Sequence, residues 1–273
     1  IAPMGGINQF REDAETILLE VAKELSIPVC LSGLSVMTIE EARNIAGELV
    51  IPSIYLYDGK EIYTKKINQY NELGIKKLVI SVDCPYTPIS YNKLDNWYDS
   101  RIYYNHNKSA MRTTSCLRHF PTWDDIAYVK NIFNGQLILK GIQSTEDISK
   151  SLDLGLNTIW MSNHGGRAVN NTWHPIDLME QFDVRNKYPT IHFITDGGIR
   201  KGSDALKCFA LGSDSIALGR LIVYGIIVAG KDGLLFTLKT FMNEIQSAML
   251  NSGAIFTNSR VTGCSIISRR KRQ

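Results

Sequence analysis

The stretch QLILKGIQSTEDISKSLDLGLNTIWMS, residues 136–162, contains a strand, a helix start and a second strand in succession. Apolar residues predominate in Gln136–Gly141 and again in Thr158–Ser162, as is typical of buried parallel strands. Between them, Ser144-Thr145-Glu146-Asp147 has the composition of a capped helix N-terminus. Two strands joined by a helix form a βαβ unit, so this stretch predicts a parallel sheet.

The same alternation of strands and helices extends along the chain. Six further strands are predicted at Ile1–Met4, Pro28–Ser32, Ser53–Tyr57, Lys77–Asp83, Ile191–Asp196 and Asp214–Gly219. Helices are predicted between them at Arg11–Leu25, Thr38–Glu48, Lys60–Leu73, Thr122–Phe133 and Lys201–Leu211. Eight strands alternating with helices predict an α/β fold, a (β/α)8 TIM barrel with its chemistry at the C-terminal ends of the strands. A doubly wound open sheet is the alternative.

Length and composition favour one globular domain. The chain has 273 residues, 44% hydrophobic and 21% charged, which fits a single large α/β domain and excludes disordered or collagen-like classes. We expect one barrel over residues 1–268, beginning inside its first strand, with a long loop at about residues 84–121. Residues 269–273 form a basic tail that accounts for the net charge of +3, so we expect no nucleic-acid surface on the body.

Cysteine usage and the lack of targeting signals favour a cytoplasmic protein. The five cysteines, which show no metal-binding spacing, are Cys30, Cys84, Cys116, Cys208 and Cys264. Reduced thiols and no metal are therefore expected. There is no basic N-terminal segment before an apolar run, no run of about 20 apolar residues and no C-terminal Ser-Lys-Leu, so no membrane association is expected.

Three predicted strand ends combine glycine with polar side chains: Ser162–Arg167, Asp196–Gly202 and Leu218–Arg220. Glycines allow backbone N–H groups to approach an anion, and Arg200 and Arg220 add charge-assisted contacts. The last two strand ends are where barrels bind phosphate, so the pattern predicts a phosphate site. The alternative is that the glycines only form tight turns.

Acid–base chemistry is indicated at the same edge of the sheet. His164 follows a strand between polar and glycine residues, which suits a general base. Asp83 ends another strand and could orient the imidazole, although it could also cap a turn. Lys140 ends a third strand, where a buried ammonium needs a partner such as a phosphate, a carboxylate or an electron-rich cofactor edge. Tyr57 could hydrogen-bond a substrate oxygen or simply pack.

The runs Ser-Asn-His-Gly-Gly-Arg (162–167), Asp-Gly-Gly-Ile-Arg-Lys-Gly (196–202) and Ala-Leu-Gly-Arg (217–220), with Lys140-Gly141, resemble a known enzyme family. It is the FMN-dependent 2-hydroxy acid oxidase and dehydrogenase family, which includes glycolate and lactate oxidases. The resemblance implies a (β/α)8 barrel with FMN that oxidises a small L-2-hydroxy acid to the 2-oxo acid. Oxygen or an electron carrier would be the acceptor, and the chain would form a homo-oligomer, a tetramer in the family.

The resemblance also implies roles for individual residues. His164 would take the substrate proton, and Asp83 would stabilise the imidazolium. Arg167 would bind the substrate carboxylate, and Tyr57 would hydrogen-bond near the substrate oxygens. The residues implied to contact FMN are Ala2, Pro3, Ser32, Tyr55 and Ser81 around the ring, Lys140 at its N1–C2 edge, Asp196 at the ribityl chain, and Gly198, Arg200, Gly219 and Arg220 at the phosphate.

The chain departs from the family pattern in three places. Tyr55 replaces the usual glutamine, and Ala168-Val169-Asn170 replaces Gln-Leu-Asp. The segment Tyr86–Tyr91 lacks the family's second substrate-binding arginine, and no arginine follows until Arg101. A diverged or truncated FMN-binding paralogue with impaired catalysis is therefore the alternative function. A flavin-type isopentenyl diphosphate isomerase is a weaker alternative, because it does not explain the histidine run.

Overall fold

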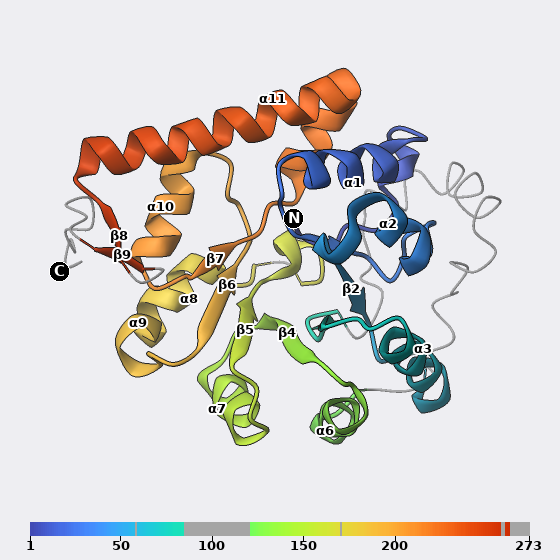
Figure 1. Cartoon of the computed structure of the whole chain (residues 1–273). Helices are drawn as coiled ribbons and strands as arrows, with labels where there is room; N and C mark the ends of the chain where they lie inside the picture. The colour runs from blue at the N-terminus through green and yellow to red at the C-terminus, as the bar shows by residue number, and fades with distance from the viewer. Residues whose placement is uncertain (58, 85–120, 170, 258–259, 263–273) are drawn as a thin grey trace.

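The computed structural model describes residues 1–57, 59–84, 121–169, 171–257 and 260–262. At its centre is a curled parallel sheet of seven strands that neighbour one another in chain order (Figure 1). The strands are β1 (Val29–Leu31), β2 (Val50–Ile54), β3 (Lys77–Ser81), β4 (Gln136–Ile142), β5 (Thr158–Met161), β6 (His192–Thr195) and β7 (Ser215–Ile216). Each corresponds to a predicted strand, and the parallel sheet confirms that part of the fold prediction.

Helices lie around the outside of the curled sheet (Figure 1). They are α1 (Ala14–Glu24), α2 (Ile39–Ala46), α3 (Lys60–Glu72), α6 (Trp123–Ile132), α7 (Thr145–Asp153), α8 (Pro175–Phe182), α9 (Val184–Lys187), α10 (Gly202–Ala210) and α11 (Arg220–Ser252). The predicted cap of α7 is confirmed, because Ser144 Oγ accepts a hydrogen bond from the Asp147 N–H at 3.1 Å. A two-stranded antiparallel hairpin, β8 (Ile255–Thr257) with β9 (Arg260–Thr262), follows α11 and was not predicted.

The predicted first strand, Ile1–Met4, is not a strand in the structure. Two backbone hydrogen bonds nevertheless join this segment to both edges of the sheet. The Ala2 N–H donates to the Leu218 carbonyl at 3.0 Å, just beyond β7, and the Cys30 N–H in β1 donates to the Ile1 carbonyl at 3.0 Å. The terminal ammonium of Ile1 also donates to the Pro28 carbonyl at 2.6 Å, just before β1. These few bonds are too short a ladder to count as a strand, but they place the segment between β7 and β1.

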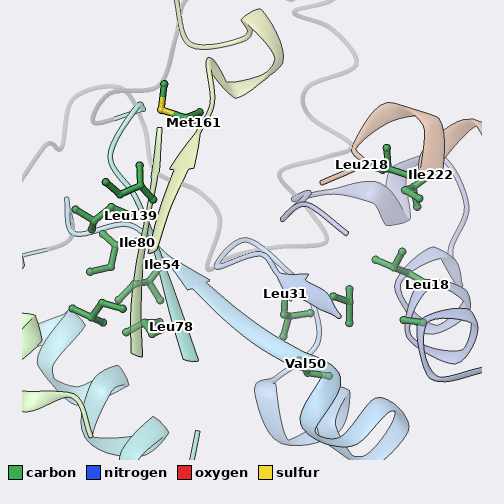
Figure 2. Packing of buried hydrophobic residues seen from close by; sticks show 14 of the residues in the cluster. Leu18, Leu31, Val50, Ile54, Leu78, Ile80, Leu139, Met161, Leu218 and Ile222 are labelled. Atoms are coloured by element: carbon green, nitrogen blue, oxygen red, sulfur yellow. The ribbon is translucent and has the colours of Figure 1, made fainter. Parts of the chain in front are cut away.

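The buried residues form two apolar layers on opposite faces of the sheet. The outer layer lies between strands and helices, and Figure 2 shows Ile54, Leu78, Ile80 and Leu139 packed within it. The inner cluster contains one residue from each strand or its end, and one from the N-terminal segment: Ala2, Cys30, Ile51, Val79, Ile138, Trp160, Ile194 and Ala217. Because neighbouring residues on a strand point to opposite faces, this second set lines the interior of the curled sheet.

Helix α11 is the largest element that was not predicted. It spans 33 residues, and Ala229 and Gly230 interrupt its helical backbone. An 18-residue window has a mean hydropathy of 1.7, so by length and composition alone it could cross a membrane. In this fold it packs along α1 and α10 (Figure 1). We therefore interpret it as part of the outer helical layer.

Several expectations concern parts of the chain outside the described residues. These are most of the long loop at 84–121, including Tyr86–Tyr91 and Arg101, and the basic tail at 269–273. Cys116 and Cys264 also lie there. Within the described part of the chain, Cys30 and Cys208 are free thiols.

Candidate active site

Five polar residues of the site each lie two positions after a residue of the interior cluster in the sequence. The pairs are Cys30 and Ser32, Val79 and Ser81, Ile138 and Lys140, Trp160 and Ser162, and Ile194 and Asp196. A separation of two keeps both members of a pair on the same face of a strand. The second member of each pair lies toward the C-terminal end, so these side chains gather at one mouth of the curled sheet.

His164 is held by a buried carboxylate. Its Nδ1 lies 2.8 Å from Asp83 Oδ1, and the Asp83 side chain is only 1% exposed, against 22% for His164. The His164 N–H donates to Ser162 Oγ at 3.1 Å, which fixes the backbone of the turn. His164 has a φ of 56°, in the left-handed region, and Gly165 and Gly166 continue that turn at 68° and 73°. With Nδ1 engaged, Nε2 is the nitrogen available for proton transfer.

Gly141 allows Asp83 to reach this position. Its φ of +108° disfavours any L side chain, and an added Cβ would lie 2.4 Å from both Cβ and Cγ of Asp83. The Lys140-Gly141 pair therefore has two separate functions in the site. Lys140 supplies charge, and Gly141 leaves room for the carboxylate that orients His164.

Lys140 lies between two buried carboxylates. The residue is 3% exposed, and its Nζ donates to Ser162 Oγ at 3.0 Å and to Asp83 Oδ2 at 3.4 Å. Asp196 Oδ2 lies 3.9 Å from the same Nζ. Carboxylates, one of the three kinds of partner considered for this lysine, thus neighbour the buried ammonium.

The two carboxylates differ in pKa because their surroundings differ. Burial alone would raise the pKa of Asp83, but the hydrogen bond to His164 and the charge of Lys140 outweigh it and hold this pKa below its usual value. Burial raises the pKa of Asp196, and the opposing charge of Lys140 does not compensate. Asp83 is therefore firmly ionised at neutral pH, whereas ionisation of Asp196 depends on its few polar contacts.

The depressed pKa of Asp83 predicts a pH-dependent contribution to stability. Asp83→Asn should lower the free energy of unfolding by about 1–3 kcal/mol at pH 7, because the charged hydrogen bonds to His164 and Lys140 are weakened. The contribution of a carboxyl with a lowered folded pKa is present above its unfolded value, about 3.9, and is lost as pH falls through the folded pKa. Urea unfolding of both proteins from pH 7 down to pH 3 measures this.

Asp13→Asn is the control for this experiment, because Asp13 pairs with Arg11 on the surface and its side chain is 52% exposed. It should change stability little at any pH. A wild-type advantage over Asp83→Asn that is equally large at pH 3 and pH 7 would contradict the assignment of Asp83 as the ionised partner.

Two tyrosines form the side of the site next to His164. The rings of Tyr55 and Tyr57 stack with centroids 5.1 Å apart, and the Tyr55 ring lies 6.5 Å from the imidazole. Burial raises the pKa of Tyr55, so its phenol is neutral and can donate a hydrogen bond. The exposed Arg167 acts on Tyr55 and Cys84 through its positive charge, which places this cation beside the aromatic pair.

The predicted phosphate residues are brought together only in part. Arg220 is exposed, and its Nη2 donates to the Gly165 carbonyl at 2.9 Å, which joins it to the histidine turn. Gly219 directly precedes α11, whose N-terminal N–H groups favour an anion. Gly198 is exposed with a φ of +77°. Arg200 is half-buried, and its Nη1 donates to the neighbouring Ile199 carbonyl at 3.1 Å rather than contacting Arg220.

The residues expected around the cofactor ring lie at the same mouth. Ser81 is buried, with its hydroxyl 3.4 Å from that of Ser53, and Ser32 Oγ accepts from the Leu34 N–H at 3.2 Å. Ala2 is buried and Pro3 is half-buried beside it. These serines retain hydrogen-bonding capacity for a polar ligand.

Sequence reasoning missed Ser162 and Trp160 as members of the site. Ser162 accepts hydrogen bonds from both Lys140 and the His164 backbone, and its place at the start of the histidine run could have indicated this. Trp160 donates from Nε1 to Asp196 Oδ2 at 3.0 Å. A tryptophan within an apolar strand gives no such signal, because the contact depends on how neighbouring strands are placed.

Comparison with known proteins identifies the family. The model of the FMN-dependent dehydrogenase family matches residues 1–258. The chain belongs to this family. The peroxisomal (S)-2-hydroxyacid oxidase of Arabidopsis thaliana is 28% identical over 268 residues, covering 93% of this chain and 73% of that protein. Human 2-hydroxyacid oxidase 1 is 27% identical over 264 residues, covering 88% and 70%.

Solved structures agree with the sequence relatives. Mandelate oxidase bound to benzoyl-formic acid has a TM-score of 0.76 and 25% identity to this chain, with 91% of this chain and 72% of that one covered. The L-lactate dehydrogenase (cytochrome) of Saccharomyces cerevisiae is 27% identical over 216 residues, which cover 72% of this chain and 36% of that protein. The relatives thus include both oxidases and a cytochrome-linked dehydrogenase.

FMN is the cofactor of this family, and the residues present fit it. Asp196 Oδ1 is buried and accepts no hydrogen bond from any described residue. A buried acceptor of this kind requires a donor, and the hydroxyl groups of a ribityl chain supply one. The buried ammonium of Lys140 suits the electron-rich edge of a flavin ring, and the glycine and arginine residues around α11 suit its phosphate.

Proposed function

We propose that this member of the FMN-dependent dehydrogenase family oxidises a small 2-hydroxy acid, either glycolate or an (S)-2-hydroxy acid of the lactate type, to the 2-oxo acid. The observation that carries the proposal is the contact of 2.8 Å between His164 Nδ1 and the buried Asp83 carboxylate. It leaves Nε2 as a base at the mouth of the sheet, the arrangement that supports a catalytic histidine in other enzymes.

Each residue has one task in the proposed reaction. His164 Nε2 takes the proton of the substrate hydroxyl, and Asp83 stabilises the imidazolium that forms. Arg167 binds the substrate carboxylate, and Tyr57 donates a hydrogen bond to a substrate oxygen. FMN supplies the two-electron acceptor for the hydride from the substrate α-carbon. The positive charge of Lys140 favours negative charge beside it.

The cofactor-binding roles are proposed from the same residues. Ala2, Pro3, Ser32, Ser81 and Tyr55 would line the ring, with Tyr55 offering a phenol where a glutamine is usual. Asp196 would meet the ribityl chain. The phosphate would lie between the N-terminus of α11 and the side chains and glycines of the sixth and seventh strand ends: Gly198, Arg200, Gly219 and Arg220.

We also propose that the sheet closes as an eight-membered barrel within one domain spanning residues 1–268. The hydrogen bonds of Ile1 and Ala2 to both sheet edges support closure, and so does the interior cluster to which Ala2 contributes the eighth residue. A homotetramer, a cytoplasmic location, and oxygen or an electron carrier as acceptor complete the proposal. Some relatives are named as peroxisomal.

An anaerobic absorbance spectrum tests the activity. The purified chain is loaded with FMN and mixed with glycolate, L-lactate or (S)-mandelate, with D-lactate as the stereochemical control. Bleaching of the flavin band by glycolate or by one of the (S)-acids, and not by D-lactate, is expected. Bound flavin that no acid bleaches would instead support an FMN-binding paralogue with impaired catalysis. That alternative is motivated by the lack of an arginine in Tyr86–Tyr91.

The phosphate role predicts that Arg200→Ala weakens FMN binding about ten- to one-hundred-fold, because one charge-assisted contact worth about 1.5–3 kcal/mol is lost. The rate of reduction of the retained flavin should change much less. Equilibrium dialysis measures the first quantity and stopped-flow absorbance the second. Arg11→Ala removes a surface arginine that pairs with Asp13 and serves as the control. Equal FMN affinity in Arg200→Ala and wild type would contradict the role.

A further inference from the structure

Trp160 lies directly beneath the charged cluster of the site. It is 2% exposed, in β5, and belongs to the interior apolar cluster. Two contacts distinguish it from an ordinary core residue. Its Nε1 donates to Asp196 Oδ2 at 3.0 Å, and Lys140 Nζ lies 5.8 Å from its ring centroid.

The two oxygens of the Asp196 carboxylate have different contacts. Trp160 Nε1 donates a hydrogen bond to Oδ2, and Lys140 Nζ lies 3.9 Å from the same oxygen. Oδ1 is equally buried, yet it accepts no hydrogen bond from the described residues. A hydrogen bond with Ser162 also acts on this carboxylate. A carboxylate rotates easily about its terminal torsion, so a donor fixed on one oxygen helps to determine where the other oxygen points.

We propose that Trp160 is a positioning residue for the cofactor. By holding Oδ2, it directs Oδ1 of Asp196 toward a hydroxyl group of the FMN ribityl chain. The inference rests on the proposed contact between Asp196 and that chain. It adds a determinant of cofactor affinity that acts through Asp196 and lies outside the strand-end motifs.

The hydrogen bond must be separated from the packing of the indole ring. Trp160→Phe keeps a buried aromatic ring, and with it the contact to Lys140, and removes the N–H donor. Trp123→Phe is the matched control. Trp123 is half-buried in α6, and Lys150 Nζ lies 5.7 Å from its ring centroid, so it has a similar cation–π contact far from Asp196.

Binding of three flavins to the apoprotein tests the proposal, with flavin fluorescence as the readout. FMN and riboflavin carry the ribityl chain, whereas lumiflavin carries only the ring. Trp160→Phe should raise the Kd of FMN and riboflavin about ten-fold, equivalent to about 1.4 kcal/mol, and leave the Kd of lumiflavin unchanged. Trp123→Phe should change none of the three. An equal loss for lumiflavin would show that Trp160 acts only through the shape of the interior, which overturns the proposal.

Asp196→Asn separates failure of this inference from failure of the underlying role. If Asp196→Asn leaves FMN and riboflavin binding intact, the proposed contact of Asp196 with the chain is wrong, and the inference fails with it. If Asp196→Asn weakens binding but Trp160→Phe does not, only the inference about Trp160 fails. The double variant should bind no more weakly than Asp196→Asn alone, because both changes remove one linked contact.

The wild-type protein provides a second readout should Trp160→Phe fold poorly. In a sample labelled with ¹⁵N at the indole nitrogens, a solvent-protected N–H signal should shift on FMN binding and also in Asp196→Asn. Trp123→Phe and Trp173→Phe assist the assignment, and Trp173 is 65% exposed. If no protected indole signal responds to Asp196→Asn, the hydrogen bond does not exist in solution and the proposal is overturned.

Discussion

Replacing His164 with alanine is expected to lower the rate of flavin reduction about 10²–10⁴-fold, the range that a positioned general base contributes. The reason is local. Asp83 engages Nδ1 at 2.8 Å and the backbone of the turn is tied to Ser162, so Nε2 is held as the proton acceptor. Stopped-flow absorbance under anaerobic conditions, with saturating (S)-2-hydroxy acid, measures the effect.

FMN affinity separates a catalytic role for His164 from a structural one. His164→Ala should bind FMN with a Kd close to wild type, because the proposed cofactor contacts come from other side chains. His192→Ala is the control: His192 is exposed at the start of β6 and contacts Ser215 at 3.0 Å, away from the site. Unchanged reduction kinetics in His164→Ala would disprove the assignment of the base.

The second large effect is expected on stability. Lys140→Met should lower the free energy of unfolding by about 3–5 kcal/mol at neutral pH, because it leaves buried carboxylates without their cation. Asp83 and Asp196 lie 3.4 Å and 3.9 Å from Nζ, and both are buried. Urea unfolding monitored by circular dichroism measures the loss.

The pH dependence distinguishes charge from packing in this variant. Without Lys140, the pKa values of both carboxyls should rise, and protonation at lower pH should recover part of the lost stability relative to wild type. Lys150→Met is the control, since Lys150 also lies above a tryptophan ring but on the outer helix α7. A loss below about 1 kcal/mol would mean that the cluster does not depend on the cation.

The alternation of strands and helices was readable because its signals are local. Apolar runs bounded by capping residues predicted all seven strands of the sheet, with end points that differ by a few residues. Helix α11 was not predicted, because its long apolar sequence is interrupted at Ala229 and Gly230 and shows little amphipathic period. Ile1–Met4 reads as a strand, but the few backbone hydrogen bonds that join it to the two sheet edges do not form a ladder.

In the site, too, the sequence indicated some features and the tertiary structure decided others. The motif residues His164, Asp83 and Lys140 could be chosen from the sequence because each lies at or just beyond the C-terminal end of a strand, and these ends of a parallel sheet share one edge. The distances between these residues could not be predicted from the sequence, because they depend on how far the sheet curls. The clearance at Gly141 is an example: a Cβ there would lie 2.4 Å from Asp83, which is 58 positions earlier in the chain.

The sequence alone therefore determined which residues lie at strand ends and at which edge of the sheet they gather, since the succession of strand and loop is a property of neighbouring residues. The tertiary structure decided which of them meet. Trp160 reaches Asp196 and Lys140 reaches Asp83 only because the strands curl about a common interior. Such contacts depend on the relative placement of separate strands, which no pattern within one strand encodes.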